Sequence, residues 1–392
     1  MTKVIFRRYK EHDEEQIISF LDKVFEGWHN KQYWTWKFGA VKKAFDRSPI
    51  IWVAEEDNSI VGHLAAVPAE MRIGDSLVSV AQIVDGATHP KHRQKGIFKN
   101  LIDKVSEDAK KEGFYAFFGF SNVPAFEVFK KKLPWLNFCE IAQMFKVTKL
   151  GSILRKLRIE KQNGGLHARA SDTSVSRTGQ MNVSGAAVLI DLIRTLLNAT
   201  VALAKPEKPT NDINIKIMTS NFTGERTQNL WHECSSNYNV AFERRTKNLN
   251  WRYQNPEAKY TTYNAHALKN GQLDGYSVTT IERSNLKVGP IGIVNLEIGH
   301  VMDILARNER TFRLILSHSE KSLIEHGVDL IHCWTIRNGP NYHLYREMGF
   351  CPFPENLGKI TFWLYTCEKI RSLDSLWNPE RILISLGDSD LY

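Results

Sequence analysis

The stretch Val80–Leu101, which reads VAQIVDGATHPKHRQKGIFKNL, is the part of the chain that decides its fold. It begins as an apolar strand, continues into a proline-containing turn and reaches Gly96 where a helix begins. The first N–H groups of a helix lack partners within it and carry partial positive charge, so they bind anions. Gly96 leaves room for an oxygen to approach the backbone. Five basic side chains add positive potential around this predicted phosphate cradle: Lys91, His92, Arg93, Lys95 and Lys99.

Length and composition bound the class of protein. A chain of 392 residues favours two domains, and 42% hydrophobic with 24% charged residues is typical of a globular protein. The net charge of +9 suits an anionic ligand, but the basic residues are not collected in runs with aromatics, so we expect no nucleic-acid partner. Five cysteines without C-x-x-C spacing predict no disulfide framework and no metal site. The N-terminus has no apolar signal core, and a cytoplasmic protein is expected.

One apolar segment, Ser184–Ala204, is long enough to span a bilayer. Asp191 and Arg194 lie near its middle, where charges are costly at bilayer depth. An amphipathic helix packed on protein is therefore favoured over contact with a membrane surface. Before this helix, residues 161–182 change to Gly, Ser, Thr, Gln and Arg, which predicts a mobile linker.

Hydrophobic periodicity predicts alternating strands and helices in the first 150 residues. Apolar residues three and four apart indicate helices over Glu14–Phe25 and from Gly96 to a stop at Gly113. An aromatic cluster between Trp28 and Phe38 is followed by a predicted loop through Pro49. A further helix is expected after Asn122 and Pro124. Strands are predicted at Val4–Phe6, Ile50–Ala54, Ile60–Val67, Phe114–Phe120 and Ile141–Val147.

The second part of the chain repeats this layout at an offset near 215 residues. The matched pairs are Trp36 and Trp251, Gly62 and Gly275, Asp85 and Asp303, Asn122 and Asn338, and Phe129 and Tyr345. A tandem duplication of one α/β unit is the best interpretation. After Asp303, however, the second copy has no proline and no glycine at the helix start, so we expect it to bind no pyrophosphate in this manner.

These residues and their order resemble the GCN5-related N-acetyltransferase (GNAT) superfamily. Thr88–Phe98 is similar to its acyl-CoA loop, R/Q-x-x-G-x-G/A, with Phe98 where the family has Gly or Ala, and Leu344–Phe350 is similar to its closing motif. The resemblance implies an α/β fold with two GNAT-like domains, each a mixed, mostly antiparallel central sheet flanked by helices. The expected division is 1–150 for the domain with the acetyl-CoA loop, 151–212 for a linker with an amphipathic helix, 213–370 for a degenerate second domain, and 371–392 for a C-terminal tail.

The resemblance also implies how an acyl donor is held. Backbone N–H groups of the turn would bind the pyrophosphate of acetyl-CoA, the expected co-substrate, and the central strand would pair with the pantetheine amides. A backbone N–H there would polarise the thioester carbonyl. The residues implied are Ile83, Val84, Gly86, Ala87, Thr88, Arg93, Gln94, Lys95, Gly96, Ile97, Phe98 and Asn122.

Candidates for proton transfer are less narrowly defined. Asp85 ranks first as base because it lies on the strand that faces the thioester, and His63, Glu70 and His89 follow. The family often protonates the thiolate with a tyrosine, and the matching position here is Phe129. Tyr115, a water or a residue of the second copy would serve instead, or the thiolate would leave unassisted. Anchoring a turn is an equal alternative for Asp85. For the two tryptophan boxes of the repeat, Trp36-Lys37-Phe38 and Trp251-Arg252-Tyr253, packing is favoured over substrate stacking.

We therefore expect an acyl-CoA-dependent N-acetyltransferase that acetylates the amine of a small acceptor by direct attack in a ternary complex. An amino sugar or a polysaccharide precursor is the expected acceptor, by analogy alone. Two alternatives stay open. One is an aminoacyl transferase of the peptidoglycan cross-bridge type, and the other is a non-catalytic binding protein that kept the fold.

Overall fold

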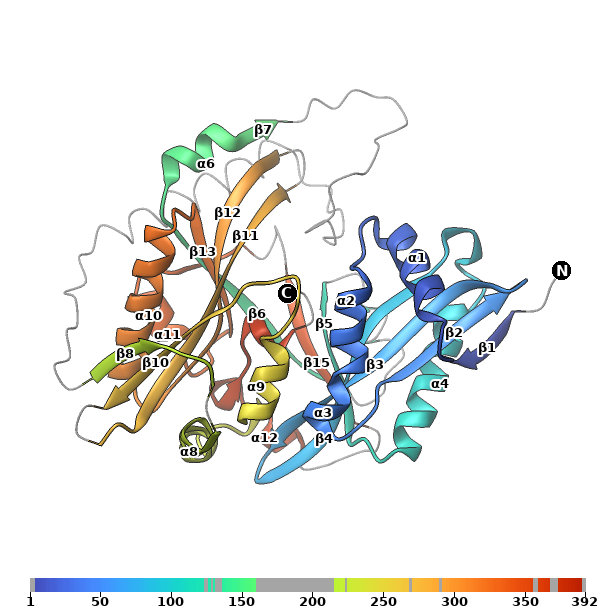
Figure 1. Ribbon diagram of the computed structural model, residues 1–392, viewed down its shortest axis with the longest axis horizontal. Coiled ribbons are helices and arrows are strands. Elements are labelled where there is room, and N and C mark those ends of the chain that lie inside the picture. The colour runs from blue at the N-terminus through green and yellow to red at the C-terminus, as the bar shows by residue number, and fades with distance from the viewer. Residues whose placement is uncertain are drawn as a thin grey trace.

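The computed structural model describes residues 4–122, 126–127, 130, 136–159, 215–222, 224–267, 270–288, 291–354, 359–366 and 373–389. The predicted linker at 161–182, the helix at 184–204 and Phe129 lie outside the described residues. Within them, sixteen strands form one sheet, most of whose neighbours run antiparallel, with helices on both faces (Figure 1). The strand order along the main path is β1-β2-β3-β4-β5-β15-β6-β13-β12-β11-β10-β8.

The first half follows the predicted order of elements, and α1 has the predicted bounds. Two short helices form over the aromatic cluster, and a third forms within the segment expected as a loop before Pro49. The first begins because the Asn30 side chain accepts hydrogen bonds from the N–H groups of Gln32 and Tyr33. The elements are β1 (Ile5–Arg8), α1 (Glu14–Phe25), α2 (Lys31–Trp34), η1 (Thr35–Gly39), α3 (Val41–Phe45), β2 (Ile50–Glu56), β3 (Ser59–Ile73), β4 (Ser76–Thr88), η2 (Pro90–His92), α4 (Ile97–Lys111), β5 (Ala116–Asn122) and β6 (Leu136–Val147).

The second half repeats this order around a central pair of long strands. Its elements are α6 (Leu150–Lys156), β7 (Leu157–Ile159), β8 (Ile215–Thr219), α8 (Gly224–Ser235), β9 (Val240–Phe242), α9 (Thr246–Arg252), β10 (Thr261–Ala267), β11 (Leu273–Val288), β12 (Ile291–Ala306), α10 (Glu309–Glu325), β13 (Leu330–Ile336), α11 (Tyr342–Glu347), β14 (Cys351–Pro352), β15 (Ile360–Thr366), α12 (Leu373–Leu376), η3 (Pro379–Arg381), β16 (Ile382–Leu383) and η4 (Leu386–Asp388). In the region 151–212, expected to link the two domains, the described residues 151–159 form most of α6 and all of β7, and β7 pairs with β12.

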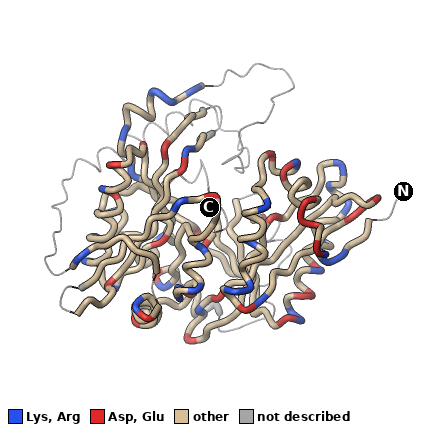
Figure 2. The backbone as a smooth tube through the Cα atoms, viewed as in Figure 1, with Lys and Arg blue, Asp and Glu red and all other residues tan. Residues whose placement is uncertain are grey.

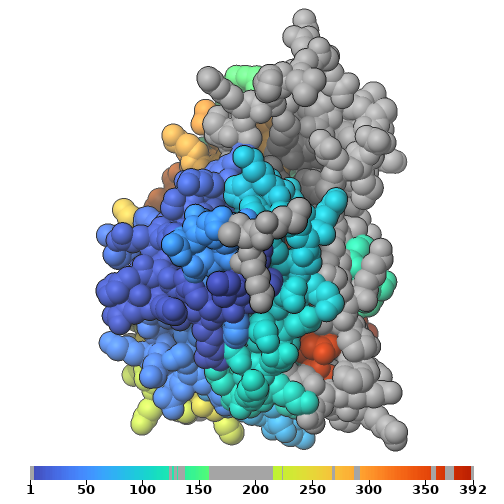
Figure 3. Space-filling model, turned by 90° about the vertical axis from the view of Figure 1, so that its right-hand side faces the viewer, coloured from blue at the N-terminus to red at the C-terminus, as the bar shows by residue number. Residues whose placement is uncertain are grey.

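The two halves share strands at their junction. β15 belongs to the second half by sequence, yet it lies between β5 and β6 and pairs antiparallel with both. β6 pairs in turn with β13 of the second half. Figure 3 shows orange-red residues of the C-terminal part at the surface beside the cyan residues of the first half. The two expected sheets are therefore joined into one.

Two apolar layers cover the first half of the sheet. The amphipathic helix α4 packs Ile97, Leu101 and Val105 against one face. On the opposite face, residues of α1 to α3 form one core with second-half residues such as Phe242 and Leu386. This face therefore becomes the interface between the halves.

Charge is distributed over the whole molecule. Lys, Arg, Asp and Glu occur throughout both halves, and the segment of α6 and β7 carries basic residues without acidic ones (Figure 2). In the part of the chain that the structure describes, no helix combines the length and apolar character needed to cross a membrane.

Candidate active site

The central strands β4 and β5 separate part-way along their length. They pair in parallel from Val80 to Gln82, opposite Ala116–Phe118, and beyond this point β5 keeps only its pairing with β15, which runs along its other edge from Ala116 to Asn122. Beyond Gln82, no described strand pairs with this side of β4. The backbone groups on that edge are therefore available to a ligand that lies along the strand. The predicted donor-binding residues 83–88 all lie on this edge or its continuation.

The separated strand leads into the turn and helix that sequence analysis singled out. Gly96 is the N-cap of α4 with φ of 76°, a left-handed conformation that glycine adopts without strain. The first bond of the helix runs from the Asn100 N–H to the Gly96 carbonyl, so the N–H groups of residues 97–99 precede the intrahelical ladder. Residues 93–96 are exposed. This end of α4 can accept an anion from solvent.

Phe98, which departs from the family signature, packs behind the strand. A Cβ atom at Gly86 would lie 2.9 Å from Phe98 Cε2 and 3.0 Å from Leu64 Cδ1, so glycine is required there. The ring thus fills the space between α4 and β4. Its size is accommodated by the absence of a side chain at Gly86.

Asp85 sits in a β-bulge of β4. Asp85 and Gly86 together face the single residue Leu64 of β3, and Asp85 has φ of 50°. Because the bulge adds one residue, both Val84 and Asp85 point to the face covered by α1 to α3. Asp85 Oδ2 lies 3.0 Å from Lys37 Nζ, and Trp28 Nε1 donates to Oδ1 at 3.3 Å.

Electrostatics hold this aspartate ionised. Burial would raise the pKa of Asp85, but the Lys37 ammonium together with His63 and Trp28 lowers it below its ordinary value. The His63 ring Nδ1–H donates to the backbone carbonyl of Asp85 at 2.9 Å, and burial lowers the pKa of His63. The imidazole is therefore neutral near pH 7. Asp85, Lys37 and His63 form a buried polar network that fixes the bulge.

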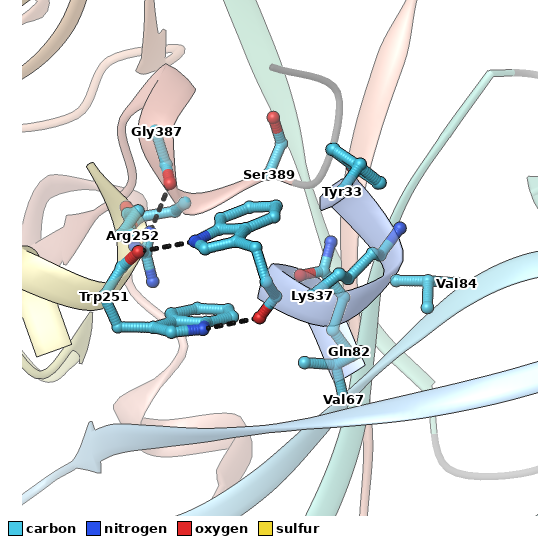
Figure 4. A pocket seen from close by; sticks show the side chains of 11 residues that line it. Tyr33, Lys37, Val67, Gln82, Val84, Trp251, Arg252, Gly387 and Ser389 are labelled. Atoms are coloured by element: carbon cyan, nitrogen blue, oxygen red, sulfur yellow. Dashed lines mark hydrogen bonds and ion pairs between the residues drawn. The ribbon is translucent and has the colours of Figure 1, made fainter. Parts of the chain in front are cut away.

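A small pocket lies where this face of β4 meets the second half. It has about 30 Å³ of space for water-sized groups. Val84 and Gln82 of β4 form one side, and Tyr33 and Lys37 stand next to them (Figure 4). The opposite side comes from the second half and comprises Trp251, Arg252, Gly387, Asp388 and Ser389. The pocket therefore adjoins the strand edge on which the thioester is expected.

The tryptophans of the two boxes stack and hydrogen-bond to each other at this pocket. Trp36 and Trp251 stack with ring centroids 5.2 Å apart and an interplanar angle of 13°. Trp36 Nε1 donates to the Trp251 carbonyl at 2.7 Å, and Trp251 Nε1 donates to the Trp36 carbonyl at 3.2 Å (Figure 4). The repeat thus forms a reciprocal interface, in agreement with the packing interpretation.

The predicted proton-transfer residues do not all meet at this place. Glu70 pairs with Ser79 in the register of β3 and β4, and the Tyr115 N–H bonds to the Ser79 carbonyl. Ser79 lies six residues before Asp85, roughly 20 Å along the strand at about 3.3 Å per residue. Glu70 Oε2 accepts from Asn248 at 2.9 Å and serves the interface between the halves. Of the ranked residues, only Asp85 and His63 lie at the bulge.

The remaining predicted residues have local structural partners. His89 caps η2 by accepting from the Lys91 N–H at 3.3 Å. Asn122 ends β5 opposite Ile360 of β15. No described group of three or more His, Cys, Asp or Glu side chains could hold a metal ion.

Sequence reasoning missed three kinds of residue at this site. Lys37 was treated as part of an aromatic box, and its separation from Asp85 in sequence concealed the ion pair. Arg252 was likewise seen only as a repeat match. The segment Ile382–Ser389 was taken as a tail, although its run of Ile382, Leu383, Ile384 and Leu386 is an apolar signal, and these four side chains are buried.

Comparison with known families addresses the first half of the chain. Residues 6–126 match the family model described as Acetyltransferase (GNAT) domain. Residues 6–126 therefore resemble a GNAT domain. The match spans the separated strands, the bulge and the Gly96 turn. Among curated proteins, none matches the sequence.

Solved structures show that the GNAT fold extends over both halves. A probable N-acyltransferase from Enterococcus faecalis is 9% identical with a TM-score of 0.59, covering 94% of this chain and 73% of that one. A tandem GNAT protein from the clavulanic acid biosynthesis pathway is 12% identical with a TM-score of 0.50, covering 94% and 100%. Saccharomyces cerevisiae N-myristoyltransferase with bound myristoyl-CoA is 10% identical with a TM-score of 0.52, covering 93% and 83%. The tandem GNAT fold is therefore established for this chain.

Proposed function

We propose that the protein is an N-acyltransferase that moves an acetyl group from acetyl-CoA to the amine of a small acceptor. The observation that carries this proposal is the free edge of β4 beyond Gln82, which leads directly into the glycine-capped end of α4. A linear donor with an anionic end fits such a path. The GNAT match covers the same residues.

The donor would be held mainly by backbone groups. The pantetheine amides would pair with the edge at residues 83–88, and the pyrophosphate would bind the N–H groups at 94–98. Arg93 and Lys95 are exposed beside the turn and add positive potential. This arrangement would place the thioester near the bulge at Asp85, next to the pocket.

The reaction requires little acid–base assistance from the protein. The amine nitrogen attacks the thioester carbon, the C–S bond breaks, and one proton passes in net from the amine to the thiolate. A thiol is a good leaving group near neutral pH. Since neither Asp85 nor His63 lines the pocket, we assign them to positioning the bulge, so that a backbone N–H can polarise the carbonyl. The amine proton would leave through water.

The reacting amine of the acceptor would enter the pocket between the halves, whose space of about 30 Å³ takes only this group, while the rest of the acceptor stays outside it. Both cations of the pocket have anionic partners, because Lys37 pairs with Asp85 and Arg252 pairs with Asp388 at 2.6 Å. The pocket is therefore close to electrically neutral and lined by aromatic rings. Such a lining suits an amine in its uncharged form, and by analogy alone we propose an amino sugar or a polysaccharide precursor as the acceptor.

Thiol release from acetyl-CoA tests this function. We expect D-glucosamine and related amino sugars to accelerate release, with a rate that rises with pH as the amine loses its proton. Acetyl-CoA binding without release for any amine in a broad panel would indicate a non-catalytic GNAT-fold binding protein instead.

A further inference from the structure

The second half contains the same strand separation as the first. β12 and β13 pair in parallel from Ile298 to Val301, opposite Leu330–Cys333, and beyond this point β13 keeps only its pairing with β6, which runs along its other edge from Leu330 to Ile336. A bulge at Met302 precedes Asp303, the repeat counterpart of Asp85. In the first half, the corresponding gap is the path proposed for the acyl donor. Here it is occupied.

The occupant is the chain's own C-terminal segment, Ile382–Ser389. Its one-turn helix η4 contacts both β12 and β13. Gly387 lies so close to β12 that an added Cβ atom would be 3.1 Å from the Met302 carbonyl oxygen and would overlap Tyr253 Oη. Every residue from 382 to 389 is buried. The segment thus fills the gap along the bulge of β12.

Buried charges anchor this segment. Arg244, 1% exposed, lies 3.2 Å from Asp303 and 3.0 Å from Asp388. Arg252 also pairs with Asp388 and donates to the Gly387 carbonyl. Two arginines and two aspartates form a neutral cluster. In the low dielectric of the interior, removing any one of these charges would leave its partner buried and uncompensated. The aspartate of β12 therefore holds the C-terminal segment.

The helix after β12 offers no anion site either. The Asn308 side chain caps α10 by accepting from the Thr311 N–H at 2.9 Å, and Glu309 occupies its first turn. A carboxylate there takes the favourable position near the helix N-terminus that a phosphate would otherwise use. Both parts of a donor site are thus replaced by groups of the chain.

We propose that residues 382–389 act as a built-in occupant of the second crevice and form the specificity-determining wall of the acceptor pocket. The segment would take in the second half the place that the acyl donor takes in the first. Its far side, Gly387–Ser389, lines the pocket opposite Val84 (Figure 4). The second half thereby gives up donor binding and shapes acceptor selection. This inference rests on the proposed function.

Hydrogen–deuterium exchange tests the occupancy without an acceptor. In the full-length wild type, we expect peptides covering 302–306 to exchange slowly and to be unaffected by acetyl-CoA, whereas peptides covering 83–88 become protected when acetyl-CoA is added. Asp388→Asn removes the charge that holds both arginines. It is expected to accelerate exchange at 302–306 at least about tenfold and to leave 83–88 unchanged.

Steady-state kinetics test the wall. With D-glucosamine as the probe, Asp388→Asn is expected to raise the acceptor KM at least about tenfold, while the Kd of acetyl-CoA stays within about twofold. Ser389→Phe keeps the ion pairs of Asp388 and adds bulk at the pocket. It should therefore also raise the acceptor KM without changing the Kd of acetyl-CoA, and it provides this test even if Asp388→Asn fails to fold. Glu320→Gln is the matched control, since Glu320 of α10 forms a buried ion pair with Lys146 of β6 at 2.7 Å and does not line the pocket. It should leave both constants unchanged.

The outcomes separate the two proposals. Unchanged exchange at 302–306 in a folded Asp388→Asn protein would overturn the occupancy. An acetyl-CoA Kd that rises in parallel with the acceptor KM, or an unchanged KM in Ser389→Phe, would overturn the proposal that this segment determines acceptor specificity. A wild type that binds no acetyl-CoA would overturn the proposed function alone, because slow exchange at 302–306 would still support the occupancy.

Discussion

Asp85 and Lys37 are buried charges of opposite sign, and each offsets much of the other's burial cost. Their side chains are 9% and 4% exposed, and the distance between them is 3.0 Å. Removing one partner of a buried pair leaves an uncompensated charge, which typically costs about 3–5 kcal/mol. We expect Asp85→Asn to lower the free energy of unfolding by about that amount in urea denaturation. Combining it with Lys37→Met should recover much of the loss, and additive losses would contradict the pairing.

The pH dependence of this loss has a definite sign. Because the pKa of Asp85 is lower in the folded than in the unfolded protein, its stabilisation is complete above the unfolded pKa, near 3.9, and disappears as pH falls through the folded value. The difference in unfolding free energy between wild type and Asp85→Asn should therefore be constant from pH 5 to 7 and shrink below about pH 4. A difference that grows on acidification would refute the assigned charge state.

At the residue scale, the sequence predicted backbone roles better than side-chain partners. Gly96 was identified because a glycine after a cationic turn has a local physical meaning, and its φ of 76° agrees with that meaning. Lys37 was missed as a partner of Asp85 because the two lie on different elements. A local pattern contains no information on which buried charges will meet.

At the scale of elements, the short helices η1 and α9 join the halves through one tryptophan each. The stacked rings and reciprocal hydrogen bonds of Trp36 and Trp251 depend on each other. Each Trp→Ala change should cost about 2–4 kcal/mol of unfolding free energy. The double variant should lose about 1–2 kcal/mol less than the sum, because either change alone removes the shared contact.

A second tryptophan provides the control for this cycle. Trp52 lies in β2 and donates from Nε1 to Asp108 of α4 at 2.8 Å, on the other face of the sheet. Trp36→Ala and Trp52→Ala should therefore add within about 0.5 kcal/mol. Equal coupling energies in both cycles would contradict a specific contribution of the Trp36–Trp251 contact to stability.

Elements with a single strong periodicity were predictable, and those without one were not. Apolar residues three and four apart in α1 and α4 determine which side faces the sheet, and both helices were located correctly. The aromatic cluster between Trp28 and Phe38 has no clear period, since its rings face α1, the sheet and the second half together, and its helices α2 and η1 were missed. The helix α3 was missed because the segment after the cluster was predicted as a loop.

At the scale of the whole molecule, β15 makes the two halves one folding unit. Gly119 of β5 lies against the indole of Trp363 in β15, where a Cβ atom would be 2.7 Å from Trp363 Cε2. Gly119→Val should therefore destabilise the protein by about 1–3 kcal/mol through overpacking. Because β15 links both halves, tryptophan fluorescence and circular dichroism should show one shared transition at a lower denaturant concentration.

The control for this change is another strand glycine. Gly292 of β12 has no heavy atom within 4 Å of an added Cβ, so Gly292→Val should change stability by less than about 1 kcal/mol. Two separate transitions in wild type would contradict a shared folding unit.

The tandem layout was visible in the sequence, but its joining was not. Residue matches at one offset indicated two copies of one unit, and the solved structures with the tandem GNAT fold agree. Placing β15 between β5 and β6 depends on pairing between segments more than 200 residues apart, since Trp363 lies opposite Gly119. Local periodicity does not predict such a long-range partner. For the same reason it did not predict that residues 382–389 pack in the second crevice.

Calorimetric titration with acetyl-CoA tests the central claim, one donor site at the free edge of β4 and the Gly96 turn. Wild type should bind one acetyl-CoA per chain, and Gly96→Glu should bind it at least about tenfold more weakly, because it adds strain and a negative charge where the pyrophosphate would lie. Gly113→Glu is the matched control, since Gly113 has φ of 74° near the other end of α4. It should bind as wild type does. Equal affinity in wild type and Gly96→Glu, or two sites per chain, would contradict the claim.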